Sequence, residues 1–497
     1  MLSAGRRVQR RAKPGTVWLR GFCLWSADLL TTNLIGELEN AVGPGAVLTD
    51  GDSRERLSFD AIGRSRFSGR ESLAESRVDA VVRPATTAQV AAVVRAAAAA
   101  GVAIIPYGGG TGVMGAVVPF QGGVAVDLRR MDAILDVSTA DRLARVQPGV
   151  VLADLDAEAR RHGLLFGHDP WSLPIATVGG AISTDSVGYR ASKYGSMGQQ
   201  VRAVEMVLGD GAVARTRPLA RQSSGPQLVG TVVGSEGSMG IITEATVELF
   251  AEPEARTFST FGFASFAQGY PLVVRLFDRG LRPSLIDLTE EEPHDLAQGF
   301  RCLLYLGFEG YREEVAAQQS RTTAEALAAG GADLGPAATE RYWHSRHAVA
   351  ERWRERTAPL RPTERWACSD WRGADYLHVS LPASRVLDYE HQAQAIAASH
   401  GLEMAETAVW TDPRLFSMLI VDPQHGSGGS EWRLATAADA LLDLALSMDG
   451  GVEYCHGIGI KLDRWMPREW GGALVLARRL KAAVDPASTL NPGKLGL

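Results

Sequence analysis

Hydrophobic positions in the first third of the chain fall into short runs separated by one stretch with helical spacing. The runs Val78–Pro84 and Val102–Ile105 predict buried strands, and a further run predicts a strand over Gly123–Leu128. The stretch between the first two runs starts with Thr86 and stops at Gly101, which predicts a helix because Thr favours helix starts and Gly favours helix ends. Strand, helix and strand in this order predict a βαβ unit.

A glycine-rich loop, Gly108–Gly112, follows the second of these strands. Such loops expose several backbone N–H groups on one side and allow a phosphate to approach closely. The loop is neither a Walker A loop, because no Gly-Lys-Ser/Thr follows, nor a clean Rossmann fingerprint, because no suitable helix and no ribose-binding acid follow. Taken alone, it is more often a tight turn than a nucleotide site.

Two further glycine clusters change this balance. The stretch Gly167–Gly195 places small residues at Thr177, Gly179, Gly180 and Ser183, against which a large flat ligand can lie. A third cluster opens the stretch Gly234–Leu249, just before a predicted strand. Three clusters within one segment favour an extended nucleotide ligand over simple turns.

Composition excludes several other classes of function. A net charge of -6 and the absence of a basic stripe argue against nucleic acid as the partner. The four cysteines are far apart and form no CxxC, so neither a disulfide framework nor a zinc cluster is indicated, and a reducing cytoplasm is expected. Residues 1–30 form a basic tail that we expect to be disordered, with an organellar presequence as the alternative. No run reaches the roughly 18 apolar residues of a membrane span.

The motifs together carry a family resemblance. D-A-V-V-R-P-A-T-T-A-Q-V, P-Y-G-G-G-T-G-V, A-T-V-G-G-A-I-S-T and G-S-M-G-I-I-T-E-A resemble the FAD-binding domain of the vanillyl-alcohol-oxidase/PCMH superfamily. The later C-H-G-I-G and V-D-P-A-S-T-L-N-P-G-K-L resemble its FAD-linked oxidase branch, which holds D-lactate and glycolate dehydrogenases and alkyldihydroxyacetonephosphate synthase.

The resemblance implies an α+β fold: a two-subdomain PCMH-type FAD-binding domain with an inserted ferredoxin-like cap domain. An N-terminal wrap would span residues 31–75, the FAD-binding domain 76–255, the cap 256–449, and a segment returning to the flavin site 450–497. The strand and helix rhythm of the middle region suits such a cap, with helices expected near Phe266–Arg279 and from Glu313 to Ala329.

The resemblance also implies which residues hold FAD. The expected cofactor-binding residues are Gly108, Gly109, Gly110, Thr111, Gly112, Thr177, Gly179, Gly180, Ser183, Asp185, Ser186, Tyr194, Ile241, Ile242 and Asn491. Thr111 stands where covalently flavinylated relatives carry a histidine, so FAD is expected to be non-covalent, with Cys455 and His168 as the remaining candidates for attachment.

His456 is the expected catalytic base, because an imidazole with a pKa near 7 suits removal of a hydroxyl proton as hydride leaves carbon. Tyr454 and Arg346 are weaker catalytic candidates. No catalytic metal is expected, since the two histidines of metal-dependent relatives are missing around residues 408–416 and Cys455 replaces their glutamate. Cys455 and His456 alone offer too few ligands.

The sequence therefore predicts an FAD-dependent oxidoreductase that transfers a hydride from an alcohol or hydroxy acid to the flavin, with a homodimer as the default assembly. A synthase-like transferase without net redox change is the first alternative, although Asp287 stands where the synthase carries an arginine and would repel a substrate phosphate. A non-catalytic flavoprotein is the second alternative. The substrate itself is a small molecule that the sequence does not name.

Overall fold

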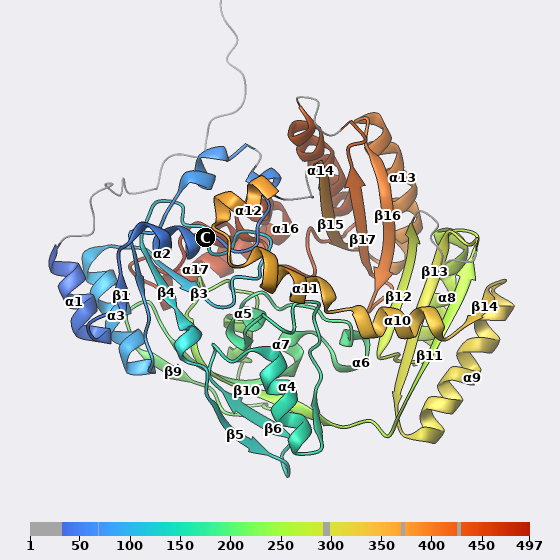
Figure 1. Ribbon diagram of the computed structural model, residues 1–497, viewed down its shortest axis with the longest axis horizontal. Coiled ribbons are helices and arrows are strands. Elements are labelled where there is room, and N and C mark those ends of the chain that lie inside the picture. The colour runs from blue at the N-terminus through green and yellow to red at the C-terminus, as the bar shows by residue number, and fades with distance from the viewer. Residues whose placement is uncertain (1–31, 68, 292–298, 369–372, 425–428) are drawn as a thin grey trace, which may run out of the picture.

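The computed structural model describes residues 32–67, 69–291, 299–368, 373–424 and 429–497. The basic tail expected at residues 1–30 lies outside these residues. The described chain is a mixture of helices and sheets, with three sheets arranged in two halves (Figure 1). No helix of the described residues is long and apolar enough to cross a bilayer.

The first sheet is small and partly parallel. Its strand order is β1 (Val47–Leu48), β2 (Ala80–Val82), β4 (Val124–Asp127) and β3 (Ile104–Tyr107), with β2 and β3 both parallel to β4. Helix α3 (Thr87–Ala100) joins β2 to β3, so the predicted βαβ unit is present. Thr86 accepts a hydrogen bond from the backbone N–H of Gln89, and Gly101 ends the helix with a φ of 65°.

The second sheet has six strands, and all its pairs are antiparallel. Its order is β5 (Ile134–Ser138), β6 (Leu143–Val146), β10 (Ile241–Ala251), β8 (Val201–Val207) and β9 (Val213–Arg215), while β7 (Leu164–Phe166) pairs with the end of β10. Helices α4 (Leu152–Arg161), α5 (Val178–Ser183), α6 (Ala191–Tyr194) and α7 (Met197–Gln200) lie between these strands in the chain. Helices α1 (Thr32–Val42) and α2 (Gly51–Arg56) precede the first sheet, and α1 packs on α3.

The third sheet forms the other half of the molecule (Figure 1). Its order is β14 (Ala332–Gly335), β11 (Ala255–Phe263), β13 (Cys302–Gly310), β12 (Leu285–Glu291), β16 (Glu403–Trp410), β17 (Leu415–Val421) and β15 (Ala374–Ser380), all antiparallel. The associated helices are α8 (Phe266–Asp278), α9 (Arg312–Ala328), α10 (Ala337–Ser345), α13 (Val386–Ser399) and α14 (Ser430–Ser447). After α10 the chain forms α11 (Ala348–Arg352) and α12 (Pro362–Cys368), and Trp366 of α12 packs on Phe59 and Phe67 of the first half.

The two faces of the third sheet differ in chemistry. Alternate residues such as Leu288, Val409 and Phe416 join a large apolar core with α8, α13 and α14. The opposite face carries polar residues, among them Asp287 and Tyr376. Ser417 of β17 lies on this polar face and forms a hydrogen bond with Tyr454, so the polar face is turned towards the C-terminal segment.

The C-terminal segment returns to the first half, where the chain end lies (Figure 1). It contains α15 (Gly459–Leu462), α16 (Met466–Trp470) and α17 (Leu474–Val484). Beyond α17, Ile104 of β3 donates its N–H to Thr489 O and accepts the N–H of Asn491, both at 2.8 Å. These residues, Thr489–Asn491, are hereafter the C-terminal strap, and they lie beside the strand that leads into the glycine-rich loop.

Candidate FAD and catalytic site

A cavity lined by glycines lies between the first two sheets and the C-terminal segment. Of the residues expected to hold FAD, those that line it are Gly108, Gly109, Gly110, Thr111, Gly112, Thr177, Gly179, Gly180, Ser183, Ser186, Ile241 and Ile242. His456 and Cys455 line the same cavity. The three glycine clusters and the C-terminal turn therefore meet at one place, hereafter the glycine-lined cavity.

Close approach of two loops explains the glycines. A Cβ at Gly108 would lie 2.6 Å from Thr177 Oγ1, and one at Gly109 would lie 2.6 Å from the carbonyl oxygen of Ile175. The N–H of Gly109 donates to Thr177 Oγ1 at 3.2 Å. A side chain at Gly108 or Gly109 would collide with the loop that carries Thr177, so this part of the cradle is made of backbone, as a pyrophosphate requires.

Two of the expected cofactor ligands, Asp185 and Tyr194, do not line the glycine-lined cavity. Asp185 accepts the N–H of Gly198 at 2.8 Å and does not line the cavity. Tyr194 donates to Glu309 Oε1 of β13 at 2.9 Å and lines a different cavity. Both residues flank the glycine clusters in sequence, but their side chains bind other parts of the protein.

Asn491 supports the cavity from behind its wall. Its side-chain amide donates to Ala116 O at 2.9 Å and to Glu236 O at 2.6 Å, and both of these residues line the cavity. Asn491 thus fastens the C-terminal strap to the cavity wall, although it is not itself part of the lining.

Glu236 is a functional residue that the sequence interpretation missed. Its side chain is buried, lines the cavity and accepts the N–H groups of Ile458 and Gly459 at 2.5 and 2.9 Å. Burial raises the pKa of Glu236 to about 7. Through these bonds the loop before β10 holds the turn that carries His456. The signal was present in G-S-E-G, as an acidic residue inside a glycine cluster.

Glu453 holds the same turn from its other side. Its Oε1 accepts the backbone N–H groups of Tyr454, Cys455 and His456 at 3.1, 2.8 and 3.0 Å, and lies 3.8 Å from Nδ1 of His456. Burial raises the pKa of Glu453 to about 7. The turn that carries His456 is thereby held by two buried carboxyl groups, that of Glu236 before β10 and that of Glu453 in the C-terminal segment.

The pKa of His456 is not near 7, as the sequence interpretation assumed. Burial, followed by the nearby cations Arg66 and Lys461, lowers it to about 3. His378 of β15 lies against His456 with ring centroids 4.4 Å apart, and burial also places its pKa well below the usual range. Both imidazoles are therefore neutral at physiological pH, the form that can accept a proton.

The other two catalytic candidates do not line the cavity. Tyr454 forms a 2.6 Å hydrogen bond with Ser417 Oγ of the third sheet. Arg346 donates to Asp169 Oδ2 at 3.0 Å, and its guanidinium lies 3.8 Å from the ring centroid of Trp343. These partners hold Arg346 between the two halves, outside the lining of the glycine-lined cavity, and its catalytic role stays a prediction.

The side chains considered for covalent attachment of FAD give no competent nucleophile in the cavity. Thr111 and Cys455 line it, but burial raises the pKa of the Cys455 thiol far above its usual range, so the reactive thiolate is disfavoured. His168 lies behind the wall, with Nε2 2.8 Å from Ser186 Oγ. This chemistry agrees with non-covalent FAD.

One premise of the metal argument is wrong. His378, Glu453 and His456 each offer a donor atom, and these atoms lie within 4.8 Å of one another. The donor types suit zinc or manganese. The surroundings suit these metals less, because Arg66 and Lys461 lie nearby, both paired with Asp375, and Oε1 of Glu453 already accepts three N–H groups. The absence of a catalytic metal stays a prediction, now on electrostatic grounds.

Comparison with known proteins agrees with the site. Residues 78–217 match the family described as FAD binding domain, and residues 252–495 match that of FAD linked oxidases, C-terminal domain. The chain belongs to the FAD-linked oxidases. It is thus an FAD-dependent oxidoreductase, as the sequence predicted.

Relatives fall into the expected branches. The probable mitochondrial D-lactate dehydrogenase of Danio rerio is 29% identical over 89% of this chain and 89% of its own. Alkyldihydroxyacetonephosphate synthase of Trypanosoma brucei brucei is 26% identical over 93% of this chain and 80% of its own. The structure of p-cresol methylhydroxylase with bound substrate has a TM-score of 0.74 at 19% identity, covering 94% of this chain and 96% of that one, and confirms the PCMH-type fold.

Proposed function

We propose that this protein oxidises the carbon of a hydroxy acid or alcohol by hydride transfer to FAD bound non-covalently in the glycine-lined cavity, with His456 accepting the hydroxyl proton. The observation that carries the proposal is the position of His456, in the wall of the cavity formed by the three glycine clusters. FAD supplies the electron chemistry when bound. The protein supplies its cradle, the orientation of the substrate and the base.

The surroundings of His456 support its role as base. Burial keeps the imidazole neutral, so its ring nitrogen is free to accept a proton, but the same low pKa makes the imidazolium costly unless an anion stabilises it. Glu453 lies 3.8 Å from Nδ1, and its ionisation above about pH 7 would stabilise the imidazolium that forms. The nearby cations Arg66 and Lys461 both pair with Asp375, at 3.4 and 2.7 Å, so they do not select between hydroxy acids and alcohols, and both classes are tested.

The alternative transferase has less support. Asp287 of β12 is half-buried and accepts a hydrogen bond from Tyr342 at 2.8 Å, so a carboxyl group occupies the place at which the resemblance put a phosphate-binding arginine. The chain orders β11-α8-β12-β13-α9-β14 and β15-α13-β16-β17-α14 support our proposal that this half is a ferredoxin-like cap inserted over the flavin. A cytoplasmic location, a homodimer and the domain limits given above also stay predictions.

A visible spectrum before and after acid precipitation, followed by anaerobic additions of hydroxy acids and alcohols, tests the proposal. We expect a yellow supernatant, and bleaching of the bound flavin by one substrate class. Yellow precipitated protein would contradict non-covalent binding. A flavin that no candidate bleaches would favour the synthase-like or non-catalytic alternatives.

A further inference from the structure

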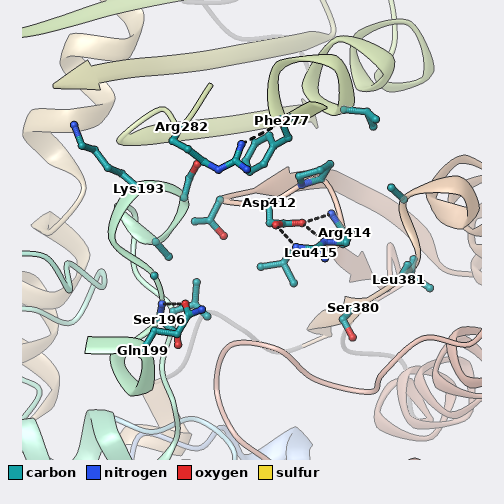
Figure 2. Close-up of a pocket in the computed structure, with 18 of the residues that line it drawn as sticks. Lys193, Ser196, Gln199, Phe277, Arg282, Ser380, Leu381, Asp412, Arg414 and Leu415 are labelled. Atoms are coloured by element: carbon teal, nitrogen blue, oxygen red, sulfur yellow. Dashed lines mark hydrogen bonds and ion pairs between the residues drawn. The ribbon is translucent and has the colours of Figure 1, made fainter. Parts of the chain in front are cut away.

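A second, larger cavity lies between α6 and the third sheet (Figure 2). Lys193, Ser196 and Gln199 lie on one side of it, and Asp412, Arg414 and Leu415 of the β16–β17 turn lie on the other. Its volume is about 1030 Å³, at the upper end of the roughly 300–1,000 Å³ of pockets that hold drug-sized ligands. We call it the cap cavity.

Apolar side chains from separate elements meet in the cap cavity. They are Val187 before α6, Val274 and Phe277 of α8, Leu381 after β15 and Leu415 of β17. Val187 and Leu381 are buried, and Val274, Phe277 and Leu415 are partly buried, so each turns part of its apolar surface towards the cavity. An apolar ligand group would cover them.

The basic side chains around the cap cavity already have partners. Arg414 forms two 2.7 Å bonds with Asp412. Arg282 donates to the carbonyl oxygens of Phe277 and Leu281 and lies over the Phe277 ring, 5.0 Å from its centroid. Lys193 donates to Glu309 O. These contacts occupy the basic side chains, and the other charged lining residues, Asp278 and Asp449, are acidic and would not attract a carboxylate, so burial of apolar surface is the main attraction for such a ligand.

The cap cavity adjoins the reaction site. Val187 lines both cavities, and its carbonyl oxygen lies 4.0 Å from the sulfur of Cys455, the residue before His456. A substrate with its hydroxyl carbon near His456 would therefore have the cap cavity one residue away. A small hydroxy acid would leave that space to water.

We infer that the natural substrate is a hydroxy acid or alcohol that carries a large apolar group, an alkyl chain or ring, and that this group lies in the cap cavity. This inference rests on the proposed function for the position of the reacting carbon. It adds the size and polarity of the rest of the substrate, which set the specificity.

A chain-length series tests it. Anaerobic flavin reduction is measured with unbranched 2-hydroxy acids from lactate to 2-hydroxydecanoate, and we expect the rate constant divided by the dissociation constant to rise roughly fourfold per added methylene group until the cavity is filled. Leu415→Trp places a larger side chain in the cavity and should reduce the advantage of the long acids over lactate at least tenfold. The same change at Leu327, which is exposed on α9 away from both cavities, should leave that ratio unchanged.

Calorimetry with unsubstituted fatty acids separates this inference from the proposed function, because these acids cannot be oxidised at a hydroxyl group. Affinity that rises with chain length in the wild type, and falls in Leu415→Trp, supports the cap cavity even where no acid bleaches the flavin. Equal affinity or equal reduction rates along the series would overturn it. The inference would also be overturned if the advantage of the long acids over lactate were the same in Leu415→Trp as in Leu327→Trp.

Discussion

The glycine-lined cavity and the cap cavity share the lining residue Val187, but they differ in whether backbone or side-chain atoms form their walls. The first is mostly backbone from continuous motifs, in which a Cβ at Gly108 or Gly109 would collide with the neighbouring loop. The second is made of side chains from α6, α8, and the ends of β15 and β17. A backbone cradle suits a cofactor that every member of a family shares, whereas a side-chain surface can change with the substrate.

Removing the base should have the largest effect, and should separate chemistry from cofactor binding. His456→Ala is expected to slow flavin reduction by about 10²–10⁴-fold, the usual contribution of a general base, while FAD content stays at the wild-type level. Stopped-flow absorbance measures the first and the flavin-to-protein ratio measures the second. His391→Ala, on the exposed surface of α13, is the matched control. An unchanged reduction rate in His456→Ala would leave the imidazole with a structural role only.

The carboxyl group of Glu236, which holds the His456 turn against the glycine-lined cavity, should make the stability of the protein depend on pH. Burial raises the pKa of Glu236 from 4.5 to about 7, so the folded state favours its protonated form. The stability that this contributes is complete below about pH 4.5 and is lost as the pH rises through 7. Glu236→Gln keeps an acceptor for Ile458 and Gly459 without the charge. The free energy of unfolding of Glu236→Gln, measured relative to that of the wild type, should therefore increase by about 3 kcal/mol from pH 4.5 to pH 8.

Urea unfolding of the apoprotein at several pH values measures that difference. A difference between Glu236→Gln and wild type that does not vary with pH would show that Glu236 is ionised throughout, held by Lys494. In that case the turn carrying His456 would be fastened by a charged rather than a neutral group.

Crowding the backbone cradle should affect FAD before it affects chemistry. In Gly109→Ala the new Cβ would lie 2.6 Å from Ile175 O and 3.3 Å from the Ala176 Cα, both backbone atoms that cannot rotate away. Overpacking of this kind costs about 1–3 kcal/mol, so FAD affinity should fall roughly 10–100-fold, as measured by titration of the apoprotein. Gly36→Ala, in α1 with nothing within 4 Å of the new Cβ, should leave FAD affinity unchanged. Equal affinity in both variants would mean that the loop shifts freely and is no rigid cradle.

The same contrast explains what could be predicted from the sequence. The βαβ unit and the glycine loops were predictable because each is continuous in the chain and carries its own turn chemistry. Asp185 and Tyr194 were assigned to the cofactor because they flank these loops, but the direction of a side chain depends on partners such as Glu309 of the distant β13. Glu236 was missed although it stands inside a recognised motif.

Contacts between distant segments were beyond the reach of sequence patterns. His378 of β15 meets the His456 turn only because Ser380 pairs with Gly451 and brings that strand to the C-terminal segment. The low pKa of His456 is a property of the folded surroundings and appears in no local motif. The cap cavity, drawn from four separate elements, has no sequence signature at all.

The smallest expected effect is that of a chelator, and it tests the charge balance around His456. A divalent ion at His378, Glu453 and His456 would have to displace three N–H donors from Glu453 or share its other oxygen, against the positive potential of Arg66 and Lys461. We expect purified protein to hold far less than one zinc or manganese per chain by elemental analysis, and EDTA to leave flavin reduction unchanged. One metal per chain, lost in His378→Ala, would make His456 a ligand and not a base. Burial lowers the pKa of Lys461 to about 8. A protonated Lys461 would repel a metal ion at this site, so a bound metal would require Lys461 to be neutral.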